Sequence, residues 1–254
     1  PGHPLVEARR NGHHLTLTQN RFSYLENTSD QTWQIPMALT VYYQTGDAKT
    51  ISILLEETST LIDLGAGCVA YKINAGQTGF YRVAYRTPED LAAIGQKVAG
   101  KDLSPDDRWG LQNDLFAQVQ CGETSIDDYL RFLNHYLDED SYLPLSSMAD
   151  NLYHAYRVFD GSRQEAIGAF GRSMAEKTLS AIGYLPVPDD TLATSLLRDQ
   201  ILWHAVVYGS KPAAEFAAEQ FEALIQGEAI HPDILKSVLM ALSLIHISEP
   251  TRLR

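Results

Sequence analysis

Zinc-dependent hydrolysis needs histidine and carboxylate side chains, because together they bind the metal and activate a water molecule. On a helix this chemistry uses the spacing H-E-x-x-H. None of the chain's histidines is followed by Glu: His3, His13, His14, His135, His154, His204, His231 and His246. We therefore predict that these 254 residues contain no catalytic residue and no metal ligand.

The adjacent histidines His13 and His14 follow a predicted hairpin turn at Asn11-Gly12. Because neighbouring side chains of a strand point to opposite faces, we expect a surface pair that cannot share a metal ion. Three further histidines fall on predicted helices, where packed or half-exposed side chains are expected: His135, His154 and His204.

Other chemical signatures are missing from the sequence. It has no G-x-S-x-G elbow, Walker loop or G-x-G-x-x-G motif. Asp106-Asp107-Arg108 and Asp114 lie at a predicted helix start, where the acids suit the helix dipole and Arg108 can pair with a neighbouring element. Asp138-Glu139-Asp140 lacks the glycine and the terminal Glu of a calcium loop, so we predict a solvated loop there.

Composition limits the class of partner. A net charge of −12 argues against nucleic acid, and no apolar run approaches the length of a membrane span. Cys68 and Cys121 are the only cysteines, too few for a disulfide framework, and are predicted to be buried free thiols. The acidic charge and the unpaired cysteines favour the cytoplasm.

Residues 1–85 alternate between apolar and polar positions, as half-buried strands do, and predict a small antiparallel β-sandwich. Turn residues separate the predicted strands, which are Leu5–Arg9, His14–Phe22, Gln34–Tyr43, Thr50–Leu55, Thr60–Leu64, Tyr71–Ile73 and Phe80–Tyr85.

Residues 86–241 change to helical periodicity. Thr87-Pro88 and Ser104-Pro105 each place a capping hydroxyl before a first-turn proline. After a first helix from Pro88, the predicted helices are Arg108–Val119, Ser125–Leu137, Pro144–Phe159, Ser162–Ile182, Asp189–Tyr208, Lys211–Gln226 and His231–Leu242. Short links between them predict an all-α, HEAT/armadillo-like superhelix that is incomplete at its C-terminus.

Residues 242–254 differ from the rest of the helical region. The string from Leu242 to Arg252 resembles the translated transposon-end adapter of sequencing libraries. We interpret this segment as non-native and exclude it from the fold prediction.

Five strings occur in one order along the chain: Pro1–Val6 with Leu15–Phe22, Trp33–Pro36, Gly76–Tyr85, Leu103–Arg108 with Leu111 and Asp114, and Ile230–Asp233. The second to fifth strings contain, in that order, the patterns W-x-I-P, G-x-x-G-[YF]-Y-R-V-x-Y, L-S-x-x-D-R-x-x-L-x-x-D and I-x-P-D. Together they resemble the β-sandwich third domain and helical fourth domain of the gluzincin zinc aminopeptidases, the family of aminopeptidase N and the puromycin-sensitive aminopeptidase.

The resemblance implies a division of labour within a longer protein. The zinc ligands, the catalytic Glu and the peptide's amine-binding strand belong to another domain of the family, so zinc and the peptide substrate would be bound there. The helical domain would contact that domain and cover its active site. The motif residues here would be structural: Trp33, Pro36, Gly76, Gly79, Tyr81, Arg82, Tyr85, Asp107, Arg108 and Asp114.

Two other functions fit the same architecture. A stand-alone sandwich joined to a helical repeat could be a protein-interaction scaffold without catalysis, because a fold does not determine its function. A carbohydrate-binding sandwich would need exposed aromatic platforms on residues 1–85, where Trp33 is the only tryptophan.

Overall fold

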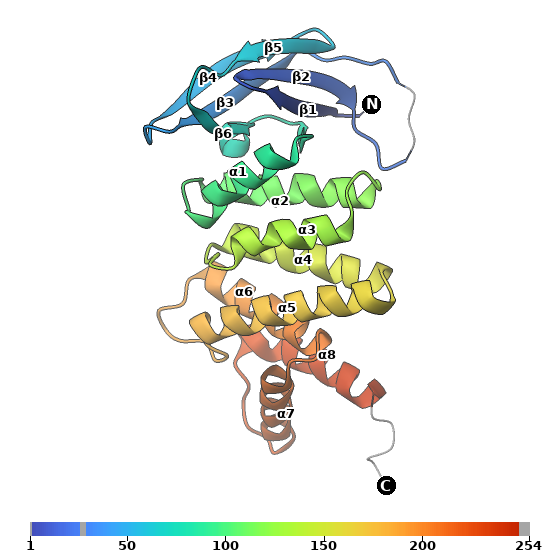
Figure 1. Cartoon of the computed structure of the whole chain (residues 1–254). Coiled ribbons are helices and arrows are strands. Elements are labelled where there is room, and N and C mark those ends of the chain that lie inside the picture. The colour runs from blue at the N-terminus through green and yellow to red at the C-terminus, as the bar shows by residue number, and fades with distance from the viewer. Residues whose placement is uncertain (1, 26–28, 249–254) are drawn as a thin grey trace. The chain divides into compact units, whose positions relative to one another are not determined.

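The computed structural model describes residues 2–25 and 29–248 (Figure 1). The chain forms two compact units, Pro1–Glu139 and Asp140–Arg254, which we call unit 1 and unit 2 and describe separately. Unit 1 holds both β-sheets and the first helices, whereas unit 2 is helical in the part that the structure describes. The division between domains at residues 85 and 86 remains a prediction: strands give way to helices there, but the compact units divide further along the chain.

Every predicted strand is present in unit 1. The strands are β1 (Pro4–Asn11), β2 (His14–Arg21), β3 (Ile35–Tyr43), β4 (Ala48–Leu55), β5 (Ser59–Asp63), β6 (Cys68–Ile73) and β7 (Arg82–Tyr85). One sheet has the order β5-β2-β1-β7 and the other the order β4-β3-β6. Alternate residues of β1 and β3 are buried, and side chains from both sheets share one apolar core. The two layers therefore form the expected sandwich.

The pairing of the last strand differs from the expected antiparallel arrangement. β7 runs parallel to β1, with Leu5 opposite Arg82 and Ala8 opposite Tyr85. The chain leaves β6 in one sheet, passes through the short 3₁₀ helix η1 (Ala75–Gln77), and enters the other sheet beside β1. This crossover between sheets sets the direction of β7, and strand periodicity carries no information about it.

Unit 1 ends with the helices α1 (Pro88–Ala99), α2 (Pro105–Gln120) and α3 (Ile126–Leu133), followed by the 3₁₀ helix η2 (Asn134–Tyr136). Ser104 caps α2 as predicted, because its hydroxyl accepts a hydrogen bond from the Asp107 amide at 3.2 Å. Thr87 makes no side-chain cap for α1. Its hydroxyl lies 3.4 Å from the Arg10 amide of β1 and accepts that hydrogen bond instead.

Unit 2 contains α4 (Tyr142–Val158), α5 (Gly161–Ile182), α6 (Leu192–Val207), α7 (Lys211–Ile225) and α8 (Pro232–Ser248). Helix α6 contacts α4, α5, α7 and α8, and its Leu197, Ile201 and Leu202 are buried. Each helix contacts the next one along the chain, and α4 and α8 also contact α6, which is compatible with stacked helix pairs. The repeat character itself remains a prediction.

A buried arginine binds the carbonyl groups at the C-terminal end of α5. Arg198 of α6 is fully buried and donates to the carbonyls of Gly183 at 2.9 Å and Ile182 at 2.8 Å. Its guanidinium also pairs with Asp190 at 2.8 Å. These bonds satisfy helix-terminal carbonyls that have no partner within the helix, and they fix the link between α5 and α6.

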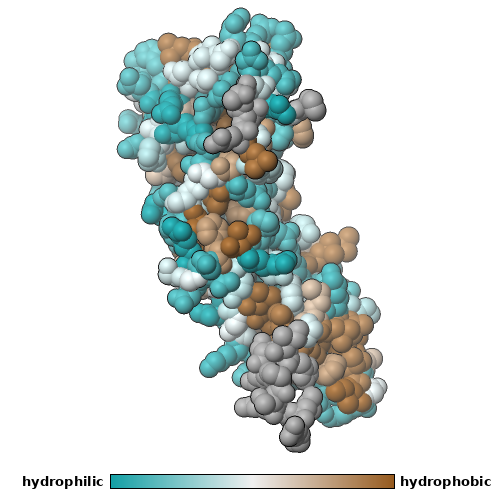
Figure 2. Space-filling model, turned by 90° about the vertical axis from the view of Figure 1, so that its right-hand side faces the viewer, coloured by the Kyte–Doolittle hydropathy of each residue, from teal (hydrophilic) through white to brown (hydrophobic). Residues whose placement is uncertain are grey.

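The surface of unit 2 carries apolar residues near its C-terminal end (Figure 2). In the last helices, Ile225 is 64% exposed and Leu239 is 44% exposed. Helix α8 continues through Ser248, so the structure marks no boundary at residue 242. The non-native interpretation of residues 242–254 remains a prediction, and residues 249–254 lie outside the described part. Within that part, no helix is long and apolar enough to cross a membrane.

Candidate functional site at the strand–helix seam

Most of the motif residues meet where β6, η1 and β7 pack against α2, a region that we call the seam. The turn at η1 requires left-handed backbone at three positions, with φ of 57° at Asn74, 71° at Gly76 and 53° at Gln77. The Asn74 side chain stabilises this turn by accepting from the Gly79 amide at 2.8 Å and donating to the Gly79 carbonyl at 3.0 Å. Gly76 adopts its conformation without the steric cost of a Cβ.

Asp107 connects the first turn of α2 to this loop. Its carboxylate accepts from the Gly76 amide at 2.8 Å and from the Ser104 hydroxyl at 3.1 Å. The Lys72 ammonium lies 3.2 Å from the same carboxylate and is 1% exposed. Burial lowers the pKa of Lys72, and Asp107 opposes that shift. Asp107 thus neutralises the buried Lys72 ammonium and also interacts favourably with the dipole of α2.

Asp114, two turns further along α2, holds β7. It accepts from the Val83 amide at 3.0 Å and from the Arg82 guanidinium at 3.2 Å. Burial raises the pKa of Asp114 to about 6, although Arg82 and Lys72 act in the opposite direction. A cavity of about 10 Å³ lies beside Lys72 and Asp114, close to the smallest volume that holds one water molecule.

Tyrosines complete the seam on the sheet side. The Tyr85 hydroxyl accepts from the Ile73 amide at 3.1 Å and donates to the Tyr71 carbonyl at 3.3 Å, which ties β7 to β6. Tyr81 is 6% exposed and its ring contacts Gly79 closely, so that a Cβ on Gly79 would lie 2.2 Å from a ring carbon. Burial raises the pKa of each hydroxyl well above its ordinary value, so these tyrosines stay protonated.

Gly110 of α2 has no side chain, so the turn at η1 can approach this helix closely. A Cβ at this position would lie 1.7 Å from the side-chain nitrogen of Gln77. η1 therefore packs directly on α2 at this point, and the charged groups of the seam have protein partners.

Arg108 faces another neighbour and corrects one prediction. Its guanidinium binds both carboxylate oxygens of Glu139, at 2.6 and 2.9 Å, and the Glu139 side chain is 1% exposed. The Tyr136 hydroxyl donates to the Arg108 carbonyl at 2.7 Å. The prediction of a solvated loop is wrong for Glu139, because a bidentate partner compensates its burial.

Trp33 and Pro36 lie away from the seam. The Trp33 amide donates to the Gln19 side chain at 2.8 Å, and the Gln19 side chain donates back to the Trp33 carbonyl at 3.0 Å. Pro36 lies in β3 with its side exposed to solvent. The Trp33 backbone is thus bonded to β2, Pro36 forms part of β3, and neither residue reaches the charged network.

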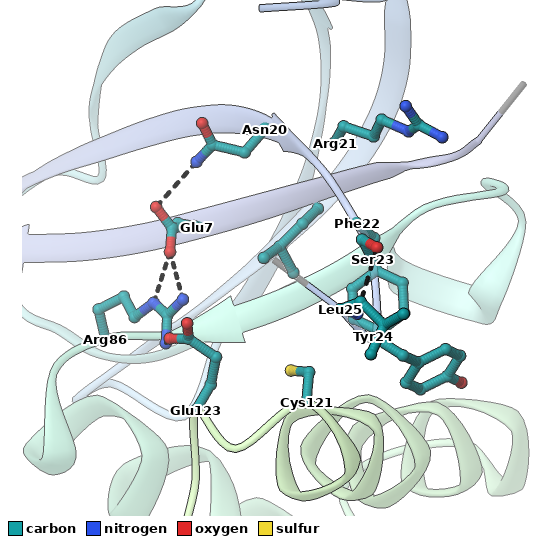
Figure 3. Close-up of a pocket in the computed structure, with 11 residues that line it drawn as sticks. Glu7, Asn20, Arg21, Phe22, Ser23, Tyr24, Leu25, Arg86, Cys121 and Glu123 are labelled. Atoms are coloured by element: carbon teal, nitrogen blue, oxygen red, sulfur yellow. Dashed lines mark hydrogen bonds and ion pairs between the residues drawn. The ribbon is translucent and has the colours of Figure 1, made fainter. Parts of the chain in front are cut away.

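An open pocket of about 480 Å³ lies on another side of unit 1 (Figure 3). Glu7 of β1 accepts from Asn20 at 3.1 Å and from Arg86 at 2.6 Å, and Arg86 also pairs with Glu123 at 3.2 Å. Cys121 lines the pocket opposite these residues. Glu7, Arg86 and Glu123 are thus paired with one another, and among the described lining residues no base is hydrogen-bonded to the Cys121 thiol.

An aromatic surface adjoins that pocket. Phe22 and Tyr24 line the pocket with ring centroids 5.0 Å apart, and His3 bridges Phe22 and Phe80 with centroid distances of 5.1 and 5.5 Å. Phe80 is 86% exposed although it lies inside the glycine-flanked motif. We call His3, Tyr24 and Phe80, which surround the buried Phe22 ring, the aromatic surface. Phe80 was predicted to begin the strand Phe80–Tyr85, and the exposure of its side chain was not expected.

The structure contradicts the expected orientation of His13 and His14. β2 begins at His14, so His13 belongs to the turn, and the two ring centroids lie 4.1 Å apart. Potential ligand atoms of both histidines and of Asp63 lie within 4.8 Å of one another. The alternation of side chains along a strand does not apply to a residue in a turn.

Both cysteines are free thiols, as predicted, but they are half-buried rather than buried. Burial raises the pKa of Cys68, whose sulfur lies 3.6 Å from the Arg10 guanidinium. Sequence patterns did not predict the roles of Lys72, Asn74 and the pair of Glu7 with Arg86. Only Lys72 had a signal, a cation inside the short apolar strand before the glycine motif.

Comparisons with known proteins agree with the residue motifs. A family model described as the ERAP1-like C-terminal domain matches residues 70–245, more than half of the chain. The puromycin-sensitive aminopeptidase of Caenorhabditis elegans is 26% identical over 90% of this chain and 25% of its own length. Aminopeptidase M1 of Arabidopsis thaliana is 25% identical over 94% of the chain and 29% of its own length.

An archaeal relative shows the same relation over a shorter segment. The probable aminopeptidase 2 of Sulfurisphaera tokodaii is 32% identical over 62% of the chain and 19% of its own length. The chain thus spans less than a third of each of these relatives. The matched region, the sandwich followed by helices and the motifs in register lead to one conclusion: the chain belongs to the ERAP1-like C-terminal domain family.

Proposed function

We propose that this chain is the non-catalytic C-terminal part of a zinc-dependent aminopeptidase that removes N-terminal residues from peptides. The observation that carries the proposal is the match to aminopeptidases over nine tenths of the chain but only about a quarter of their length. The sequence also lacks H-E-x-x-H, the motif that would bring the metal and the general base. Zinc and the peptide's N-terminus would then be held by a part of the protein outside this sequence.

The seam has a structural role in this proposal. Asp107 and Asp114 bind backbone amides of Gly76 and Val83, so α2 and the sheet are held at fixed distances. We propose that these contacts fix the start of the helical domain, residues 86–241, against the sandwich domain, residues 1–85. A fixed start lets the later helices, arranged as repeats, cover the active site and limit the access of long peptides.

The aromatic surface supports a contact with the catalytic part of the protein. Exposed aromatic side chains beside a pocket are typical of protein interfaces, where they supply large contact areas at low entropic cost. We therefore assign Phe80 and Tyr24 to the intramolecular interface. The comparisons give no support to a stand-alone scaffold.

The proposal is tested by reading the coding frame upstream of Pro1 and assaying two proteins. The complete protein should contain H-E-x-x-H and release a chromophore from an aminoacyl substrate in the presence of zinc. The isolated chain should not, even with stoichiometric zinc. An upstream frame without the motif, or turnover by the isolated chain, would overturn the proposal.

The interface is tested by substitution in both contexts. Phe80→Ser should lower the melting temperature of the complete protein while leaving that of the isolated chain nearly unchanged, because Phe80 is 86% exposed in the chain. Leu61→Ser is the matched control, since Leu61 is 65% exposed on β5, away from the aromatic surface. Equal effects of the two substitutions in the complete protein would contradict the assignment.

A further inference from the structure

Two imidazoles and one carboxylate converge at the end of the β1–β2 hairpin. His13 lies in the turn, His14 is the first residue of β2, and Asp63 is the last residue of β5. Their potential ligand atoms lie within 4.8 Å of one another, and among the residues that the structure describes no other such group of His, Cys, Asp or Glu occurs. The group lies on the sandwich, and neither the seam nor the pocket includes it.

The backbone fixes the spacing of these residues. His14 lies directly opposite Asp63 in the β2–β5 ladder, and the Leu64 amide donates to the His13 carbonyl at 2.8 Å. Gly12 has φ of +61° while His13 is not among the residues with positive φ, the sign pattern of a type II′ hairpin. The turn therefore sets His13 beside His14, and the ladder sets Asp63 beside both.

The carboxylate of Asp63 is oriented by a local hydrogen bond. Its Oδ1 accepts from the Gly65 amide at 2.8 Å. Hydrogen bonds of this kind orient metal ligands and reduce the entropy lost on binding. Among the residues that the structure describes, none forms a hydrogen bond with the other oxygen, Oδ2, which is therefore available to a ligand.

We propose that His13, His14 and Asp63 form a surface binding site for a divalent transition-metal ion, with Zn²⁺ as its occupant. Two imidazoles and a carboxylate are a donor set that suits zinc, with a water molecule in the remaining position. Two ligands of one zinc ion lie at most about 4 Å apart, because each bond is about 2 Å long. Rotation of the exposed side chains closes the remaining gap without movement of the backbone.

The bound ion would join two segments that are far apart in the chain. His13 and His14 belong to the β1–β2 hairpin, whereas Asp63 belongs to β5, the edge strand of the same sheet. An ion that binds the folded state and not the unfolded one stabilises the fold, and the stabilisation increases with the free ion concentration relative to Kd. The chain's net charge of −12 adds a general attraction for cations.

The test uses the isolated 254-residue chain after a chelator has removed bound metal ions. Calorimetric titration with Zn²⁺ should show one bound equivalent, and Zn²⁺ should raise the melting temperature. His14→Gln and Asp63→Asn should each weaken binding at least about tenfold and remove the thermal shift. Asn at position 63 keeps the acceptor for the Gly65 amide, so the loop is retained.

His231→Gln is the matched control. His231 is 49% exposed and lies 3.9 Å from Asp233, a pair of the same types without a third ligand. This variant should bind zinc as the unmodified chain does. Circular dichroism of the metal-free variants should show an unchanged fold. Absence of zinc binding by the unmodified chain, or unchanged affinity in both ligand variants, would overturn the proposal, which does not depend on the proposed aminopeptidase function.

Discussion

The seam buries Lys72, Asp107 and Asp114, and each of these charged side chains has a partner of opposite charge. Lys72 donates to the carbonyls of Ile73 at 2.6 Å and Asn74 at 3.1 Å in addition to its pairing with Asp107. Such networks contribute little net stability compared with apolar packing, but removing one partner leaves an uncompensated charge. They therefore specify which residues of α2 face which residues of the sheet.

The ionisation of Asp114 predicts a pH dependence at this scale. Its pKa rises from 3.8 in the unfolded chain to about 6 in the folded one, because burial disfavours the carboxylate. The folded state then binds more protons than the unfolded state between these values, so this residue's contribution to stability falls as pH rises through the window. Two pKa units correspond to about 3 kcal/mol.

Hydrogen exchange of the α2 amides, corrected for the intrinsic rate at each pH, measures this effect. The difference in opening free energy between the unmodified chain and Asp114→Asn should shift in favour of the variant as pH rises from 3.8 to about 6. A difference that stays constant with pH would show that folding does not raise the pKa of Asp114.

At the scale of elements, sequence patterns predicted where helices and strands occur better than they predicted how the strands pair. Alternation located every strand, and the Ser/Thr-Pro pairs located the starts of α1 and α2. The same pattern, however, produced a cap at Ser104 and none at Thr87. The reason is tertiary: β1 lies beside Thr87, and the Arg10 amide occupies its hydroxyl.

This difference between two similar caps can be measured. Ser104→Ala should lower the free energy of unfolding by about 1 kcal/mol, because it removes the acceptor for the Asp107 amide. Thr87→Ala should cost less, since it removes no cap bond and only the longer hydrogen bond of 3.4 Å from the Arg10 amide. Urea denaturation followed by circular dichroism compares the two variants, and a larger loss in Thr87→Ala would contradict the assignment of the caps.

At the scale of the whole molecule, the two compact units differ in the ionisable groups that they bury. Unit 1 buries acids and cations together at the seam. Unit 2 buries Arg198, which pairs with Asp190, and also buries the His204 imidazole of α6 beside Tyr153, with ring centroids 5.1 Å apart. Burial lowers the pKa of His204 from 6.5 to about 4, and Asp150 opposes the shift only in part. The charged imidazole is therefore excluded from the folded unit at neutral pH.

Unit 2 should consequently lose stability in acid. Between pH 6.5 and about 4 the unfolded state binds a proton at His204 and the folded state does not. The contribution of His204 is thus present above pH 6.5 and is lost as pH falls, the opposite of the contribution of Asp114 in unit 1. Hydrogen exchange of the α6 amides should show this loss in the unmodified chain and a smaller loss in His204→Phe. An equal loss in both proteins would exclude His204 as the cause.

The sequence by itself determined the alternation that forms the sheets, the capping residues that begin α2, and the motifs that identify the family. These features depend on residues close together in the chain. Tertiary structure decided that β7 runs parallel to β1, that Asp107 meets Lys72, that Glu139 is buried against Arg108, and that Asp63 joins His13 and His14. Each of these contacts joins segments that are far apart in the chain and meet only through packing. A local sequence pattern does not determine which distant residue a side chain will contact.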